Sequence, residues 1–144
     1  MSDLTLNVSR TISAPIESVY NAWLNPELLA QFMHPAANMH IAKAETDPRV
    51  GGRFTIVMAT AERELPHGGE YKELTPYSKI VFSWESSFAA DGSTVTIELK
   101  SVASGTHIEL THVKFLHEET RSSHEGGWTR IIETLSTILE PTDR

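Results

Sequence analysis

A single long stretch with helical spacing closes this chain, and it constrains the fold more than any other feature. Its apolar residues recur at steps of three and four, at Trp128, Ile131 and Leu135, as they do in an amphipathic helix. The pattern runs over residues 119–139 and stops before Pro141, because proline ends a helix. A helix of about 20 residues spans ~30 Å, which is long enough to cover a whole sheet.

The preceding residues predict such a sheet, because most of them alternate between apolar and polar side chains. Seven strands are expected, at residues 4–12, 39–45, 52–60, 69–75, 79–85, 94–102 and 106–113. Two short helices are expected between the first two strands, at residues 15–23 and 26–33, with Asn25 capping the second. The charged run AERELPHGG, residues 61–69, is expected to form an exposed strand end and a loop. Short loops favour an antiparallel meander, and the segregated order of elements indicates an α+β domain.

Composition limits the classes of partner and site. The 144 residues suit one domain, residues 1–144, with one core. The chain has no cysteine, which excludes disulfides and is compatible with a cytoplasmic protein. Its net charge of -7 argues against nucleic acid and anionic membranes as partners, since both attract basic surfaces. No apolar run approaches the ~20 residues of a membrane span, so membrane insertion is not expected.

Four segments carry a family likeness: VSRTISAPIESVYNAWLNPELLAQF, DPRVGGRFTI, GGEYKELTPYSKIVFSWE and HEGGWTRIIETLSTIL. With these segments in this order, over about residues 4–139, the chain resembles the activator of heat-shock protein 90 ATPase homologue (AHSA-type) family of the START-like, or SRPBCC, superfamily. The resemblance implies a helix-grip fold, as in Bet v-like proteins. In this fold a curved seven-stranded antiparallel sheet wraps round a long C-terminal helix, with a cavity between them. Superfamily members bind lipids, sterols, polyketides and plant hormones, and some are cyclases or hydrolases, so the site must decide the function.

A cavity in this position would be walled by inward-facing residues of the strands and helices. Large or adaptable side chains are the expected ligand contacts, because pockets are rich in aromatic residues and methionine. They are Phe32, Met33, Phe54, Met58, Tyr71, Phe82, Trp84 and Trp128. The alternative is that these residues only pack the core, which shares its wall with such a cavity.

Two glycines, Gly126 and Gly127, directly precede Trp128 inside the predicted helix. Each costs about 1 kcal/mol relative to alanine in a helix interior. We expect at least Gly127 to face the sheet or the cavity, where a side chain would collide with Phe82 or Trp84 or would fill the space. The alternative is that the pair only bends the helix.

The polar candidates for the site are Tyr71, Glu73, His112, Arg121 and His124. His112 shares the parity of inward-facing apolar residues, and His124 lies four residues before Trp128 on the same helical stripe. The two histidines could orient a carboxylate or a hydroxyl, or act as acid and base. The alternative is a hydrogen-bonded core histidine near the rim of the sheet. Glu73 would be a buried carboxylate if its face is inward, but Leu74 on the opposite parity leaves the facing of residues 69–75 open.

No metal ligand and no cofactor is expected. The histidines lack the tight spacing of a zinc motif, and the sequence contains no G-x-S-x-G elbow and no phosphate-binding glycine loop. The first hypothesis is therefore a protein that binds a small apolar or amphipathic ligand without catalysis. The second is a cyclase- or hydrolase-type enzyme, for which His112, His124 and Glu73 are the only candidates and no catalytic residue is assigned. The third is a chaperone-binding or stress-response module. A monomer and a homodimer are both compatible with all three.

Overall fold

The computed structural model describes residues 4–34, 38–86, 92–115 and 117–140. Within them the chain forms seven strands and three helices. The elements are β1 (Leu4–Ile12), α1 (Ile16–Ala22), α2 (Pro26–Phe32), β2 (His40–Thr46), β3 (Arg53–Ala59), β4 (Glu64–Thr75), β5 (Lys79–Ser83), β6 (Thr94–Val102), β7 (Gly105–Phe115) and α3 (Glu118–Leu139). The predicted order of elements and the α+β helix-grip class are confirmed. Among the described helices, none combines the length and the hydropathy that a membrane span requires.

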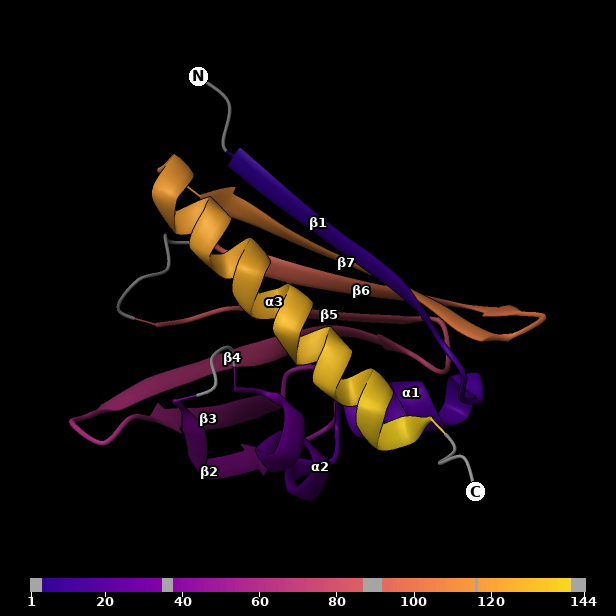
Figure 1. Ribbon diagram of the computed structural model, residues 1–144, viewed down its shortest axis with the longest axis horizontal. Helices are drawn as coiled ribbons and strands as arrows, with labels where there is room; N and C mark the ends of the chain where they lie inside the picture. The colour runs from indigo at the N-terminus through magenta and orange to yellow at the C-terminus, as the bar shows by residue number, and fades with distance from the viewer. Residues whose placement is uncertain (1–3, 35–37, 87–91, 116, 141–144) are drawn as a thin grey trace.

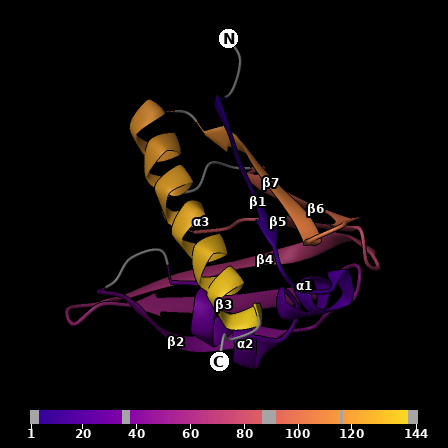
Figure 2. The same ribbon diagram turned by 45° about the vertical axis from the view of Figure 1, so that its right-hand side comes forward.

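The strands form one antiparallel sheet in the order β1-β7-β6-β5-β4-β3-β2. The strands from β2 to β7 are a meander, in which each strand pairs with the next along the chain. The first strand, β1, joins this meander at β7. The helix α3 runs obliquely across one face of the sheet (Figure 1), and the sheet curls around it (Figure 2).

The two short helices lie near the C-terminal half of α3 in both views (Figures 1 and 2). The second begins where predicted, because the Asn25 side chain accepts hydrogen bonds from the backbone N–H groups of Glu27 and Leu28, at 2.9 and 3.2 Å. Pro26 occupies the first helical turn, where a missing N–H costs nothing. This arrangement covers one end of the sheet and leaves the N-terminal half of α3 to face the sheet alone.

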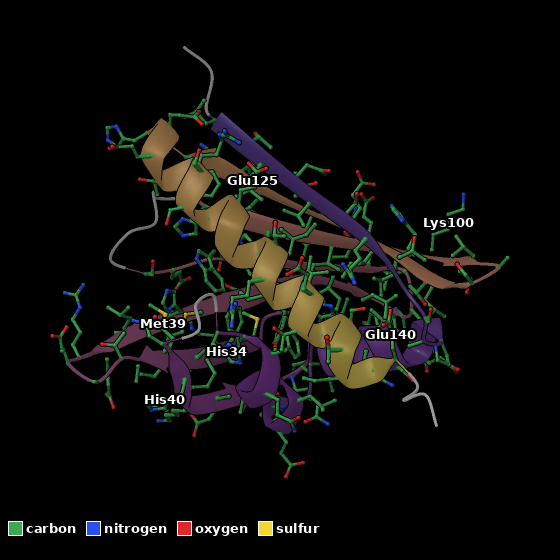
Figure 3. All side chains as sticks on the ribbon, in the orientation of Figure 1. His34, Met39, His40, Lys100, Glu125 and Glu140 are labelled. Carbon is green, nitrogen blue, oxygen red and sulfur yellow. The ribbon has the colours of Figure 1, made fainter. Side chains whose placement is uncertain are left out.

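The hydrophobic core lies between α3 and the sheet, and side chains fill most of the space between them (Figure 3). Trp128, Ile131 and Leu135 of the predicted stripe are at most 3% exposed. Ile138, which belongs to the same predicted stripe, is only half-buried. The stripe therefore packs against the sheet over its first two turns, from Trp128 to Leu135, and is less buried toward the helix end.

The fourth strand begins earlier than the sequence predicted. It starts at Glu64 rather than at residue 69, so most of the run expected to form an exposed end and a loop is a strand paired with β3. On its other side, this early part pairs with the described residues only through an isolated bridge, between Gly68 and Glu85. A proline is tolerated where a strand lacks a ladder partner on one side, and none of the described residues pairs with Pro66 on that side.

An irregularity within β4 settles which of its residues face the core. Tyr71 pairs with Phe82, whereas the next paired residues are Glu73 with Val81 and Leu74 with Ile80, so the register shifts between Tyr71 and Glu73. A bulge of this kind inserts one residue and changes the parity of the strand. Tyr71 and Leu74 therefore both point inward, and Glu73 points away from the core.

Candidate ligand pocket

An apolar hollow lies between the N-terminal half of α3 and the strands β3 and β4. Its volume is about 420 Å³, within the range of roughly 300–1,000 Å³ that small-molecule sites occupy. Its lining residues come from the loop before β2, from β3, from β4, from the position directly after β5 and from α3. They are Met39, Met58, Leu65, His67, Trp84, Glu119, Thr120, Ser123, His124, Gly127, Trp128 and Ile131.

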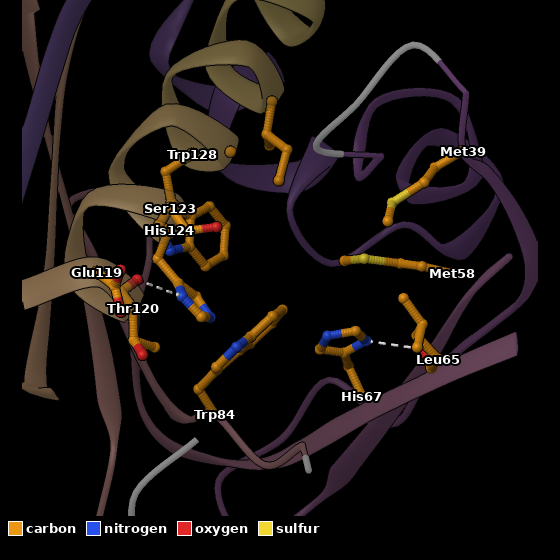
Figure 4. A pocket seen from close by; sticks show the side chains of 12 residues that line it. Met39, Met58, Leu65, His67, Trp84, Glu119, Thr120, Ser123, His124 and Trp128 are labelled. Atoms are coloured by element: carbon orange, nitrogen blue, oxygen red, sulfur yellow. Dashed lines mark hydrogen bonds between the residues drawn. The ribbon is translucent and has the colours of Figure 1, made fainter. Parts of the chain in front are cut away.

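Two indole rings form the inner wall of this pocket. Trp84 follows β5 and Trp128 belongs to α3, and their ring centroids are 5.1 Å apart with the planes tilted by 59°. Both are at most 3% exposed, so their positions are fixed by the surrounding core. Met58, Leu65 and Met39 face them from across the hollow (Figure 4). The wall is therefore rigid and aromatic on one side and flexible and aliphatic on the other, which suits an apolar guest.

The two helical glycines have different surroundings. Gly127 lines the pocket, whereas a Cβ built on Gly126 meets no atom within 4 Å. The missing side chain thus leaves space in the pocket only at Gly127. Gly126 is exposed, and nothing around it requires a glycine.

Two histidines flank Trp84 from opposite sides of the pocket (Figure 4). The Nδ1 atom of His124 lies 2.9 Å from the carbonyl oxygen of Thr120, and the Nδ1 atom of His67 lies 2.9 Å from that of Leu65. A carbonyl oxygen only accepts hydrogen bonds, so Nδ1 carries the proton in each ring. Neither Nε2 atom has a hydrogen-bond partner among the described residues, and each is left as an acceptor when the ring is neutral.

Burial keeps His67 neutral. Burial lowers the pKa of the His67 ring, and a charge on His124 would lower it further. The hydrogen bond from the ring to the Leu65 carbonyl acts in the opposite direction and raises the pKa. The ring also lies against Trp84, at a centroid distance of 5.1 Å. His67 therefore presents an uncharged acceptor to the pocket at neutral pH.

His112 lies behind the pocket wall rather than in it. It is fully buried and both of its ring nitrogens are engaged: Trp128 Nε1 donates to Nδ1 at 3.0 Å, and Nε2 lies 2.6 Å from Ser93 Oγ. Because Nδ1 accepts, Nε2 carries the proton and donates it to Ser93. Burial, together with the nearby His124, lowers the pKa of His112 to about 3. Of the two readings of this histidine, the geometry fits the hydrogen-bonded core histidine.

Several residues expected as ligand contacts lie deeper in the core. Met33, Phe54, Tyr71 and Phe82 surround a crevice of only about 10 Å³, which is at the limit of what one water molecule needs. The ring of Phe54 packs against Tyr71 at 5.5 Å and against Phe82 at 5.1 Å, so these side chains fill the space themselves. Burial raises the pKa of Tyr71.

Phe32 lies apart from the pocket as well and packs edge-on against Trp23, at 5.1 Å. Of the aromatic and methionine contacts expected, the structure thus brings together Met58, Trp84 and Trp128, and it adds the expected Gly127 and His124.

Two charged candidates lie outside the pocket. Glu73 points away from the core, accepts a hydrogen bond from Thr75 at 2.9 Å and pairs with Lys79 at 3.8 Å. The bulge in β4 is the reason, because it places Glu73 on the outer face. Arg121 is held along α3 by Glu118 and by Glu125, the latter at 2.9 Å. Neither side chain lines the pocket. Of the three acid–base candidates His112, His124 and Glu73, only His124 does, so no two of them meet there.

Sequence reasoning missed Leu65 and His67, which face the pocket from the early part of β4. A signal was present, because residues 65, 67, 69 and 71 share one parity and Tyr71 was an expected ligand contact, although the facing of residues 69–75 was left open. Because proline and glycine are uncommon inside strands, Pro66, Gly68 and Gly69 led instead to the prediction of a loop. It also missed Met39 before β2 and three polar residues of α3, namely Glu119, Thr120 and Ser123.

Among the described residues, no three histidine, aspartate or glutamate side chains gather closely enough to hold a metal ion. The described residues that line the pocket include no lysine or arginine, and Glu119 is the only acidic residue among them. What the pocket offers is therefore an apolar wall with neutral acceptors and hydroxyl groups at its helical side.

The family model described as "Activator of Hsp90 ATPase homolog 1-like protein" matches residues 13–140. A comparison with curated proteins gives no significant match. Among solved structures, protein CV1439 from Chromobacterium violaceum is 26% identical with a TM-score of 0.83, over 96% of this chain and 98% of that one. Protein NE0264 from Nitrosomonas europaea is 25% identical with a TM-score of 0.80, over 94% of each chain. The AHSA1-like protein from Aeromonas hydrophila, 20% identical with a TM-score of 0.81 over 98% of this chain and 99% of that one, shares the fold.

Proposed function

This chain belongs to the family of Activator of Hsp90 ATPase homolog 1-like proteins, and we propose that it binds a small apolar or amphipathic molecule in the pocket between α3 and the sheet. One observation carries the proposal: a hollow of about 420 Å³, walled by Trp84, Trp128 and Met58, adjoins the hydrophobic core. Protein interiors are close-packed and tolerate few voids. An apolar hollow of this size, bordered by buried aromatic rings, is the kind of space that a ligand occupies.

Binding without catalysis agrees better with the side chains than an enzymatic reaction does. An enzyme of the cyclase or hydrolase kind needs titratable groups that converge on the bound substrate. Of the three candidates for that chemistry, only His124 lines the pocket. His112 has both ring nitrogens engaged by Trp128 and Ser93, and Glu73 lies on the outer face of the sheet.

A chaperone-binding role finds less support on the described surface. Its large exposed apolar residues are Val50, Tyr77 and Val102. They belong to three separate turns or strand ends, and single exposed apolar residues are ordinary on a protein surface. The pocket is therefore the feature from which a function is best argued.

The two glycines of α3 supply a test with a matched control. We expect the wild-type protein to bind the uncharged apolar fluorescent probe Nile red, and Gly127→Leu to lose most of that binding because its side chain enters the pocket. Gly126→Leu makes the same chemical change at a position whose Cβ meets no atom, so it should bind the probe as the wild type does. Thermal melts of both variants separate a blocked pocket from a damaged fold. Absence of probe binding by the wild type, or equal binding by the two variants, would overturn the proposal.

A further inference from the structure

The two pocket histidines offer hydrogen-bond acceptors without offering donors. In each ring the Nδ1 proton is committed to a backbone carbonyl, Leu65 for His67 and Thr120 for His124, both at 2.9 Å. The remaining Nε2 atoms are lone-pair acceptors that have no partner among the described residues. Figure 4 shows the two rings on either side of Trp84, both turned toward the pocket.

A ligand in this pocket must complement these acceptors. A carboxylate, a sulfonate or a phosphate brings further acceptors and a charge, and the described residues that line the pocket include no lysine or arginine to neutralise it. Burying an unpaired charge is costly, so an anionic ligand is disfavoured.

A cationic ligand is disfavoured for a related reason. An ammonium group would find acceptors, but it would have to leave water for an apolar site. Among the described residues that line this site, the only carboxylate is that of Glu119, an exposed residue. An exposed partner compensates little of the desolvation of a buried charge. An uncharged donor needs no such compensation.

We infer that the ligand is an apolar molecule that presents an uncharged hydroxyl group, of an alcohol or a phenol, as hydrogen-bond donor to Nε2 of His67 or His124. This inference rests on the proposed function and names the chemistry of the ligand's polar end. The apolar part lies against Trp84 and Trp128, and the hydroxyl group lies toward the histidines. Ser123 and Thr120, whose hydroxyl groups both donate and accept, are available on the same side.

Three ligands of one shape test the inference: 2-naphthol, 2-methoxynaphthalene and 2-naphthoate. They share the ring system. 2-Naphthol offers a hydrogen-bond donor, 2-methoxynaphthalene offers none, and 2-naphthoate carries a negative charge. Dissociation constants are measured by equilibrium dialysis at roughly pH 8, where ordinary histidine rings are neutral. We expect 2-naphthol to bind roughly fivefold more tightly than 2-methoxynaphthalene, the size of one neutral hydrogen bond, and 2-naphthoate to bind most weakly.

The variants His67→Phe and His124→Phe keep a ring and remove the acceptor. We expect the preference for 2-naphthol over 2-methoxynaphthalene to disappear in the double variant, while the affinity for 2-methoxynaphthalene is kept. His107→Phe, at a histidine outside the pocket, should leave the preference intact. Equal binding of 2-naphthol and 2-methoxynaphthalene by the wild type, tighter binding of 2-naphthoate, or a preference that survives in the double variant would overturn the inference and leave the proposed function standing. Failure of all three ligands to bind would overturn both.

Discussion

The indole N–H of Trp128 donates a 3.0 Å hydrogen bond to Nδ1 of His112, and this contact joins α3 to β7 inside the core. It fixes the tautomer of His112, because an accepting Nδ1 leaves the proton on Nε2, from which Ser93 receives it at 2.6 Å. The chain Trp128–His112–Ser93 is fully buried. It positions the tryptophan whose ring lines the pocket, so the histidine supports the site without touching its contents.

The first prediction concerns acid. The pKa of His112 is lowered to about 3, whereas an unfolded histidine titrates near ~6.5, so the unfolded chain binds more protons between these values. The free energy of unfolding should therefore fall as the pH drops from about 6.5 toward 3, by at most ~1.4 kcal/mol per pH unit from this residue. Urea unfolding at several pH values in this window measures the slope.

Two variants isolate the contribution of His112 to that slope. His112→Gln does not titrate and should show a distinctly shallower fall, although it is less stable than the wild type at neutral pH. His107→Gln, at a half-buried histidine on the same strand, should keep the wild-type slope. Carboxylates with lowered pKa values, such as Glu85, also lower the free energy of unfolding in acid. They are present in all three proteins, so their contribution is the same in each slope and drops out of the difference. Parallel slopes for the wild type and His112→Gln would contradict the assignment.

The second prediction compares two tryptophans. Trp128→Phe removes the N–H that satisfies His112 and leaves a buried acceptor unpaired, which costs about 1–3 kcal/mol. Trp84→Phe removes a similar volume, but Trp84 Nε1 has no hydrogen-bond partner among the described residues, so no hydrogen bond is lost. We expect Trp128→Phe to be the more destabilising of the two in chemical denaturation. The opposite order would mean that the hydrogen bond to His112 contributes little.

The order of elements was predictable because it depends on local periodicity. The apolar spacing at Trp128, Ile131 and Leu135 indicates a helix, and alternation indicates strands, whatever surrounds them. The early part of β4 was not predictable in the same way. Pro66 is compatible with a strand only because β5 ends before it could pair there, and that is a fact of tertiary structure.

The site was predictable in part for a related reason. Parity assigned Phe54, Phe82, Met58 and Trp84 to the inner face of the sheet, and all four are buried. Parity does not say which inward residue borders a hollow and which is packed by its neighbours, since this depends on how far α3 stands from each strand. A bulge such as the one between Tyr71 and Glu73 also reverses parity without a clear signal in the residues.

The third prediction tests the packing of α3. Leu135 is fully buried, and Leu135→Ala should lower the free energy of unfolding by about 2–5 kcal/mol, as truncation of a core leucine does. Leu139 is one turn further on and only half-buried, so Leu139→Ala should cost clearly less. Denaturant titrations of both variants give the comparison. A loss below ~1 kcal/mol at Leu135 would contradict a core position.

The last prediction concerns Gly126, which the surroundings do not require. A Cβ at this position meets no atom within 4 Å, and alanine is favoured over glycine in a helix interior by about 1 kcal/mol. Gly126→Ala should therefore raise the melting temperature, partly because the unfolded chain loses conformational freedom. Gly52→Ala is the contrasting variant, since its Cβ would lie 2.1 Å from the carbonyl oxygen of Asp47 and the turn before β3 would have to move. Gly52→Ala should melt lower than the wild type, and a lower melting temperature for Gly126→Ala would show that the helix needs a glycine there for a reason other than space.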